Sequence, residues 1–192
     1  PVRHVRLAVD RVDYMVPLDL TPYAGKTVAL DIHVGDGHRR TNVINDLCWE
    51  KMCLSDEFSL ENTEKYRPAF HHTPQYGWMN DPNGMFYHDG VYHLYYQYNP
   101  YGSMWGNMHW GHSTSTDLVH WEHHPVAIAP DQWGTIFSGS AAVDTDNSAG
   151  FGENAVIAMY TSAGITQKQS MAYSLDGGKT FSHILGANGK PI

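Results

Sequence analysis

A short pattern that occurs twice limits the folds that this chain can adopt. Ser115–Asp117 stands shortly before Trp121, and Ser174–Asp176 stands shortly before Phe181. The two copies lie about one propeller blade apart, near the ~50-residue period that is expected for such repeats. We therefore expect repeated antiparallel β-sheets, in which this Ser-x-Asp pattern has a structural role.

The composition from Arg67 onward agrees with an all-β fold. This half is rich in aromatic residues, Gly, Asn and His, and it shows almost no helical periodicity. Met85–Tyr87 and Val91–Tyr98 are predicted to be two strands that are joined by a tight hairpin at an Asp-Gly pair. Alternation along the second strand places Gln97 on the face opposite to the one that carries Tyr96.

Residues 1–66 carry a different pattern. Short alternating segments such as Val5–Val9 and Thr27–Val34 are broken by Pro, Gly and Asp, which indicates the strands of a small β-sandwich. Because the region starts in mid-pattern, we expect only part of that domain. The predicted fold class is therefore all-β, with a partial β-sandwich over residues 1–66 followed by the first blades of a β-propeller over residues 67–192.

Composition and charge restrict the possible partners. The chain has 192 residues, of which 42% are hydrophobic and 17% are charged, so it can bury a core. A net charge of -8 with 12 Lys and Arg argues against a nucleic-acid groove or an anionic membrane surface. A neutral polar substrate is compatible with this charge. The apolar runs are too short to span a bilayer, and the chain opens with Pro1, as expected of a mature or excised piece.

Cysteines and histidines give no clear metal site. Cys48 and Cys53 could form a small disulfide loop or remain two free thiols, and we favour free thiols. Their Cys-x4-Cys spacing lacks the paired pattern of structural zinc motifs. None of the 13 histidines stands in a His-Glu-x-x-His motif. We therefore expect scattered strand and loop histidines, and neither a metal nor a cofactor.

The segment Trp78–Gly84 holds a carboxylate beside an aromatic residue. Its Asp-Pro-Asn-Gly string fits a β-turn in which Asp81 occupies the first position and Pro82 fixes φ at the second. An Asp at the start of a turn usually hydrogen-bonds its own backbone, so this segment alone does not establish catalysis. Further strings downstream raise the weight of a catalytic interpretation.

Together, several strings resemble glycoside hydrolase family 32, which includes invertase, inulinase, levanase and fructan β-fructosidase. The resemblance covers residues 67–192, and the strings occur in the family's order. Residues 1–66 resemble a β-sandwich module that is attached to some bacterial levanase-like members, and the second Ser-x-Asp copy resembles the Asp-box of sialidase-like propellers. The strings are Trp78–Gly84, Tyr96–Pro100, Trp105–His112 and Ile136–Ser140.

The resemblance implies a five-bladed β-propeller with a funnel-shaped active site on its axis. Asp81 matches the family's nucleophile, which attacks C2 of a terminal β-fructofuranosyl unit and forms a covalent fructosyl-enzyme that water hydrolyses with retention. The implied substrate is a fructan or sucrose-type carbohydrate, with levan favoured, and the implied location is extracellular, periplasmic or at the cell surface. The positions that match sugar-contacting residues are Asn80, Gln97, Trp105, Phe137 and Ser138.

One departure from the family pattern concerns the second carboxyl group that retaining hydrolysis needs. The family's transition-state stabiliser lies in an Arg-Asp-Pro string and its general acid in a Glu-Cys string, and neither string occurs in this chain. Glu122 and Glu153 are interpreted as solvated residues. We therefore expect both groups beyond Ile192 and negligible activity from this segment alone. A non-catalytic fructan-binding module and a fructosyltransferase stay open as alternatives, as do endo or exo cleavage and the choice among levan, inulin and sucrose.

Overall fold

A computed structural model of the chain describes residues 25–26, 65–102, 104–189 and 192. Except for residues 25–26 and 65–66, the predicted β-sandwich lies outside the described residues, and so do Cys48 and Cys53. The chain divides into two compact units, and all described strands belong to the unit that contains Asn62–Ile192.

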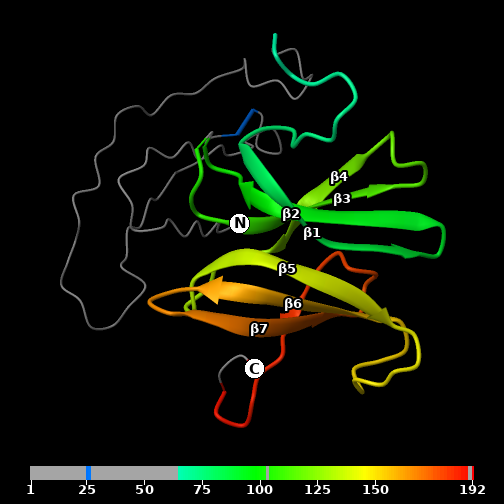
Figure 1. Cartoon of the computed structure of the whole chain (residues 1–192), viewed down its shortest axis with the longest axis vertical. Helices are drawn as coiled ribbons and strands as arrows, with labels where there is room; N and C mark the ends of the chain where they lie inside the picture. Colours follow the sequence, from blue (N-terminus) through cyan, green and yellow to red (C-terminus); the bar gives the residue numbers. More distant parts are fainter. Residues whose placement is uncertain (1–24, 27–64, 103, 190–191) are drawn as a thin grey trace. The chain divides into compact units, whose positions relative to one another are not determined.

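The described strands form two four-stranded antiparallel sheets, with strand orders β1-β2-β3-β4 and β5-β6-β7-β8 (Figure 1). Within each sheet, every strand pairs with the next one in sequence, which is the connectivity of successive propeller blades. The prediction of an all-β chain that contains the first blades of a propeller is therefore confirmed. The strands are β1 (Trp78–His88), β2 (Val91–Asn99), β3 (His109–Ser115), β4 (Glu122–Ile128), β5 (Thr135–Asp144), β6 (Ala155–Ala163), β7 (Gln167–Ser174) and β8 (Ser182–His183).

The predicted hairpin between the first two strands is confirmed. His88 pairs with Val91, and the two residues between them, Asp89 and Gly90, have φ angles of 49° and 82°. Two successive positive φ angles are typical of a type I′ turn, whose twist matches that of the flanking strands. Alternation along β2 is also as predicted, because neighbouring residues of this strand enter two different core clusters.

The predicted β-turn at Asp81–Gly84 is wrong. The chain does not reverse at this segment. It continues as part of β1, and Pro82 pairs with Tyr96 in β2. The pairing register with β2 shifts between Met79 and Pro82 and again between Asn83 and Phe86, and these two shifts mark two β-bulges. Proline has no backbone N–H to donate to a neighbouring strand. It is tolerated here because β1 is an edge strand and Pro82 lies at a bulge. Gly84, with a φ of 49°, supplies the bulge conformation.

Both copies of the Ser-x-Asp pattern form equivalent loops between the third and fourth strands of their sheets. In the first, Asp117 Oδ1 accepts hydrogen bonds from the backbone N–H groups of Val119 and His120 at 2.9 and 2.7 Å. In the second, Asp176 Oδ1 accepts hydrogen bonds from the backbone N–H groups of Lys179 and Thr180, both at 3.0 Å. The predicted structural role of the pattern, to hold the outer hairpin, is therefore confirmed.

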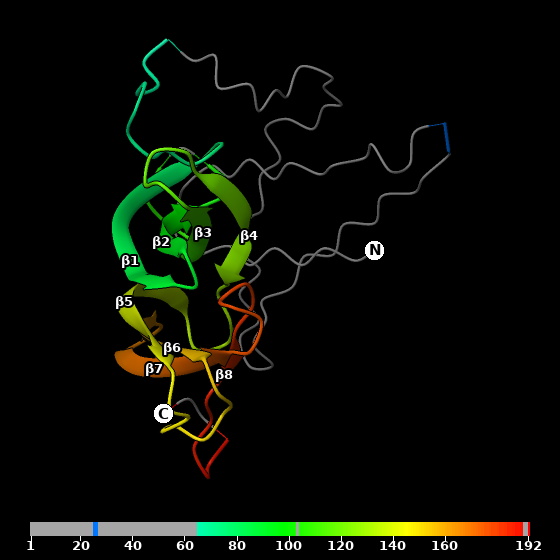
Figure 2. The same ribbon diagram turned by 90° about the vertical axis from the view of Figure 1, so that its right-hand side faces the viewer.

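A core of aromatic and aliphatic side chains lies between the two sheets, where β1 and β5 run side by side (Figures 1 and 2). Tyr95 donates its hydroxyl to the carbonyl of Gly178 at 2.7 Å, and Phe181 meets the Tyr95 ring edge-on. The aromatic residue of the second Ser-x-Asp copy thus packs between the two sheets, whereas Trp121 packs on the opposite face of the first sheet. The buried members of the core are Tyr95, Trp110, Ile128, Ile136, Ala158, Tyr160 and Ala172.

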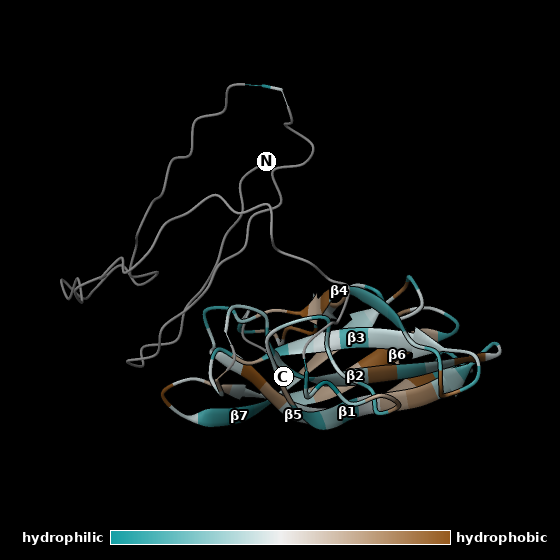
Figure 3. Cartoon of the chain, turned by 90° about the horizontal axis from the view of Figure 1, so that it is seen from above, coloured by the Kyte–Doolittle hydropathy of each residue, from teal (hydrophilic) through white to brown (hydrophobic). Residues whose placement is uncertain are grey.

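Hydropathy differs between the two interior strands of the second sheet. β6 is a central strand and is hydrophobic over much of its length, whereas β7 begins with a hydrophilic stretch (Figure 3). Among the residues with described structure, no helix has the length and apolar character needed to cross a membrane.

Candidate active site

Asp81 is an exposed carboxylate that neighbouring side chains hold on both of its oxygens. Ser138, from β5, donates its hydroxyl to Asp81 Oδ2 at 2.6 Å. Asn80 donates its amide to Asp81 Oδ1 at 3.3 Å, and Trp78 Nε1 in turn donates to Asn80 Oδ1 at 2.8 Å. The indole therefore fixes the amide so that its nitrogen faces the carboxylate. The bulges of β1 and these contacts together orient Asp81.

The same contacts keep this carboxylate ionised. The hydrogen bond from Ser138, followed by the one from Asn80, lowers the pKa of Asp81 below its ordinary value, because both stabilise the charged form. An ionised, accessible carboxylate can act as a nucleophile or as a general base.

Two aromatic side chains of the candidate site lie on β5 and on the loop before β3. Phe137 precedes Ser138 in β5, and its ring meets that of Trp105 edge-on with 5.9 Å between ring centroids. Trp105 belongs to the loop between β2 and β3 and is 52% exposed. Asn99 holds this loop, since its amide donates to Met104 O at 3.0 Å. The pair offers apolar surface from the strand that also carries Ser138, as suits a sugar ring with one apolar face.

Gln97 is buried in β2 and contacts β5. Its Nε2 donates to the carbonyl of Ile136 at 3.0 Å. Ile136, Phe137 and Ser138 are consecutive in β5, so this strand contacts or carries every predicted site residue except Asn80. The structure brings all six predicted residues together at the seam between β1, β2 and β5.

Two further residues shape the site and were not singled out from the sequence. Asn83 is 2% exposed and lies between the two bulges of β1. Gly139 follows Ser138, and a Cβ there would collide with the backbone of Met159 and Tyr160 in β6. Only glycine lets β5 pass β6 closely enough to set Ser138 against Asp81. Both residues lie inside the strings quoted above, which was the available signal.

The two glutamates that follow residue 67 lie far from Asp81. Glu122 pairs with Thr114, which pairs with His93 near the start of β2. Asp81 lies beside the other end of β2, so at ~3.3 Å per residue the two carboxyl groups are separated by roughly 13 Å along the strand. Glu153 is exposed in the loop that follows β5, at the end of that strand remote from Ser138. The interpretation of both as solvated residues agrees with their exposure.

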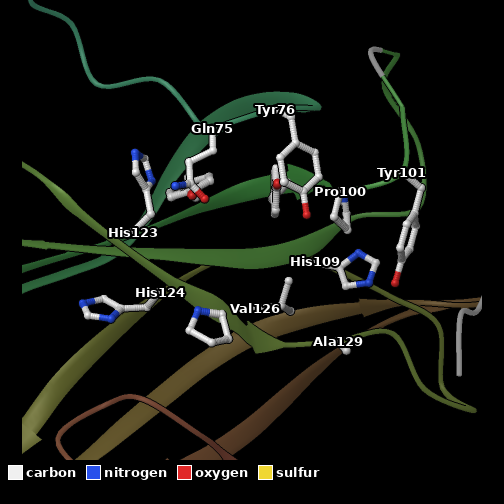
Figure 4. Close-up of a pocket in the computed structure, with 12 residues that line it drawn as sticks. Gln75, Tyr76, Pro100, Tyr101, His109, His123, His124, Val126 and Ala129 are labelled. Carbon is white, nitrogen blue, oxygen red and sulfur yellow. The ribbon is translucent and has the colours of Figure 1, made fainter. Parts of the chain in front are cut away.

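A cavity of about 550 Å³ lies away from this site. It opens beside Tyr96 and Tyr98, on the face of the first sheet that is turned away from the second sheet. Figure 4 shows Tyr101 and His109 at one end of this cavity and His123 at the other. The described residues contain no group of three or more His, Cys, Asp or Glu side chains that could hold a metal ion.

Comparison with known proteins places this geometry in a family. Residues 71–189 match the N-terminal domain of the glycosyl hydrolases family 32. The chain belongs to glycosyl hydrolase family 32. The resemblance stated above is thereby confirmed. Residues 3–70 match a domain of unknown function, DUF4980.

Curated relatives in family 32 are much longer than this chain. A levanase from Bacillus subtilis (strain 168) is 57% identical over 127 residues, which cover 64% of this chain and 19% of the levanase. The extracellular exo-inulinase inuE from Aspergillus niger is 47% identical over 147 residues, which cover 65% of this chain and 27% of the inulinase. The chain thus spans between 19% and 27% of the length of these two relatives.

Solved structures of family 32 enzymes share the described fold. Exo-inulinase from Aspergillus awamori aligns with a TM-score of 0.60 at 44% identity, over 66% of this chain and 28% of that enzyme. A fructofuranosidase from Schwanniomyces occidentalis, solved in complex with fructose, aligns with a TM-score of 0.60 at 46% identity, over 63% of this chain and 26% of that enzyme. Such enzymes contain a β-propeller domain, in agreement with the two sheets of this chain.

Proposed function

We propose that the full-length parent protein is a retaining glycoside hydrolase that releases fructose or fructo-oligosaccharides from fructans, with levan favoured and inulin or sucrose as further substrates. The observation that carries this proposal is the ionised Asp81, held by Ser138 at 2.6 Å beside the pair formed by Trp105 and Phe137. Relatives named levanase, exo-inulinase and invertase support the substrate class.

The proposed reaction has two steps. An oxygen of Asp81 attacks C2 of the terminal fructosyl unit while the bond from C2 to the glycosidic oxygen breaks, and a general acid protonates the leaving oxygen. Water then adds to C2, the ester bond to Asp81 breaks, and the conjugate base of that acid accepts the proton of the water. Because Glu122 and Glu153 are remote from Asp81, we assign the acid and the transition-state stabiliser to the parent chain beyond Ile192.

Each of the other predicted site residues has a proposed role in holding the sugar. Asn80, Gln97 and Ser138 offer polar groups to the hydroxyls of fructose, and Trp105 and Phe137 face its apolar side. Their convergence at one seam supports this assignment.

We also propose the division of the chain and its location. Residues 1–66 form a module of their own and residues 67–192 the start of the catalytic propeller, which the matched ranges 3–70 and 71–189 support. Secretion to the outside of the cell, to the periplasm or to the cell surface agrees with a polymeric substrate and with the extracellular exo-inulinases among the relatives.

The test is to incubate the full-length protein with levan, inulin and sucrose and to follow the released sugars by chromatography. We expect free fructose or short fructans, and negligible release by residues 1–192 alone. Robust turnover by the short segment would contradict the assignment of the acid. A full-length protein that binds fructans without cutting them would contradict hydrolysis, and products longer than the substrate would indicate transfer.

Replacing Ser138 by Ala should move the acid limb of the pH profile. Loss of its hydrogen bond raises the pKa of Asp81, so the carboxylate becomes protonated, and inactive as a nucleophile, at a higher pH than in the wild type. The acid limb of kcat/KM against pH is therefore expected to shift upward. Ser140→Ala, an exposed change two residues along the same strand, is the control. An unchanged acid limb in Ser138→Ala would contradict the role of this hydroxyl.

A further inference from the structure

We propose that Asn83 is a positioning residue that sets both Gln97 and the bulge of Asp81 for the substrate. This role rests on the proposed function, because the sugar is the ligand that Gln97 and Asp81 are assigned to meet. The hydrogen-bond partners of the Asn83 side chain are Gln97 and Pro82. It acts through its two neighbours, one on each side of its side-chain amide.

The neighbours of Asn83 determine how its amide is turned. With the oxygen toward Gln97, this oxygen accepts from the backbone N–H of Gln97 at 3.2 Å and from its Nε2 at 3.0 Å, while the Asn83 nitrogen donates to Pro82 O at 3.2 Å. The opposite orientation makes one hydrogen bond, from Gly139 N–H at 3.3 Å, and sets the amide nitrogen against two donors. A buried amide takes the orientation that satisfies its hydrogen bonds, so the oxygen faces Gln97.

The oxygen side of Asn83 fixes the polarity of Gln97. Gln97 Nε2 has two hydrogens, and the oxygen of Asn83 and the carbonyl of Ile136 accept one each. The nitrogen end of Gln97 is therefore fully used. Its Oε1 accepts no hydrogen bond from any residue described in the structure, so it is the end that is left to accept from a sugar hydroxyl. Without Asn83, the Gln97 amide could turn over and offer a donor instead.

The nitrogen side of Asn83 fixes the backbone next to the nucleophile. Pro82 O, which accepts from it, belongs to the residue directly after Asp81 and lies between the two register shifts of β1. A bulge breaks the regular ladder and leaves a backbone group without its strand partner. The side chain of Asn83 gives the Pro82 carbonyl a hydrogen bond inside this irregular segment, and it thereby supports the bulge next to Asp81.

The two sides of the amide can be tested separately in the full-length protein. Asn83→Ala removes both contacts, so we expect the KM for the fructan to rise at least tenfold and kcat to fall at least tenfold. Asn83→Asp keeps an oxygen toward Gln97 and loses the donor to Pro82, so kcat should fall while KM stays within about threefold of the wild type. Ser170→Ala, which removes a buried hydrogen bond in the second sheet, is the control and should leave KM unchanged.

The outcomes separate a positioning role from a merely structural one. A structural role would lower the folded fraction, and hence kcat, with no change in KM in either variant, and that result would overturn the proposal. If Asn83→Ala does not fold, Asn83→Asp decides alone: a KM that rises at least tenfold overturns the assignment of the oxygen to Gln97, and an unchanged kcat overturns the assignment of the nitrogen.

Coupling to Gln97 gives a second readout. If Asn83 acts through Gln97, the KM of the double variant with Gln97→Ala should exceed that of Gln97→Ala alone by less than threefold, whereas independent effects would multiply and overturn the proposal.

Calorimetric titration with fructose does not depend on turnover: Asn83→Ala should weaken binding at least tenfold even if the protein does not hydrolyse fructans. If the wild type hydrolyses fructans and the Asn83→Ala variant still binds fructose as the wild type does, the positioning role of Asn83 is overturned and the proposed function stands. A wild type that does not bind fructose overturns both.

Discussion

Asp81→Asn in the full-length protein is expected to lower kcat by about four orders of magnitude, which corresponds to about 5 kcal/mol of transition-state stabilisation. Asparagine has nearly the same shape but carries no charge, so it cannot attack C2 or form the ester intermediate. The fold should stay intact, because Asp81 is exposed and its contacts to Ser138 and Asn80 lie at the surface. Steady-state release of fructose checks the rate, and thermal unfolding checks the fold.

The matched control for this change is Asp89→Asn. Asp89 is also an exposed carboxylate, at the tip of the hairpin and at the opposite end of β1, and asparagine tolerates its φ of 49°. The turnover of the Asp89→Asn variant should equal that of the wild type. Near-wild-type turnover of Asp81→Asn would exclude Asp81 as the nucleophile. Loss of turnover together with loss of the folded state would show that the carboxylate has a structural role.

Mild acid is expected to destabilise the first sheet strongly, because several of its histidines are buried in neutral form. Burial lowers the pKa of His109 to about 4, and burial, with His124 and His93 nearby, lowers that of His112 to about 3. Burial lowers the pKa of His72 and His93 to about 4 as well. The charged groups that face His112 from the second sheet are Asp176 and Lys179, and they act on its pKa in opposite directions.

The sign of the effect follows from proton uptake. An unfolded histidine has a pKa of about 6.5, so between roughly pH 4 and 6.5 the unfolded chain binds protons that the folded chain does not. Stability is therefore complete above about pH 6.5 and falls as the pH drops toward 4, by about 1.4 kcal/mol per pH unit for each fully buried ring. Asp81, Asp117 and Asp176 have lowered pKa values, so they add to the loss only in more acidic solution.

Urea unfolding of the full-length protein between pH 5 and 7 measures this slope. His112→Gln removes one buried ring and should reduce the slope by about 1.4 kcal/mol per pH unit, whatever it does to stability at pH 7. His71→Gln, at an exposed position, should leave the slope unchanged. Equal slopes in both variants and the wild type would mean that His112 takes up its proton without unfolding.

Local chemistry was enough to predict some elements and misled in one. The Asp-Gly pair at residues 89–90 predicted its hairpin because few other backbones use two successive positive φ angles. The residues from Asp81 to Gly84 also suit a turn, but the same residue types serve a bulge in an edge strand. The deciding interaction is pairing with Tyr96 in β2, which the four residues themselves do not encode.

The candidate site could be predicted as a set of residues but not as a set of contacts. Rare strings identified Asp81 and Ser138, which lie 57 positions apart in sequence and meet at 2.6 Å. The role of Asn83 depends on how its amide is turned, and that is set by donors in β2. No periodicity or composition reports such an orientation. The sequence therefore predicts which side chains gather, and the structure is needed to assign donors and acceptors.

The two loops with the Ser-x-Asp pattern lie at the end of the sheets that is remote from Asp81, together with the hairpin at residues 89–90. Each loop is held by hydrogen bonds to its own carboxylate. One end of the first sheet thus carries Asp81, and the other end is secured by these turns. Fluorophores or surface-immobilisation handles attached to exposed positions such as Val119 and Lys179 would stay clear of Asp81, so this end offers attachment points for single-molecule tests of the proposed hydrolysis.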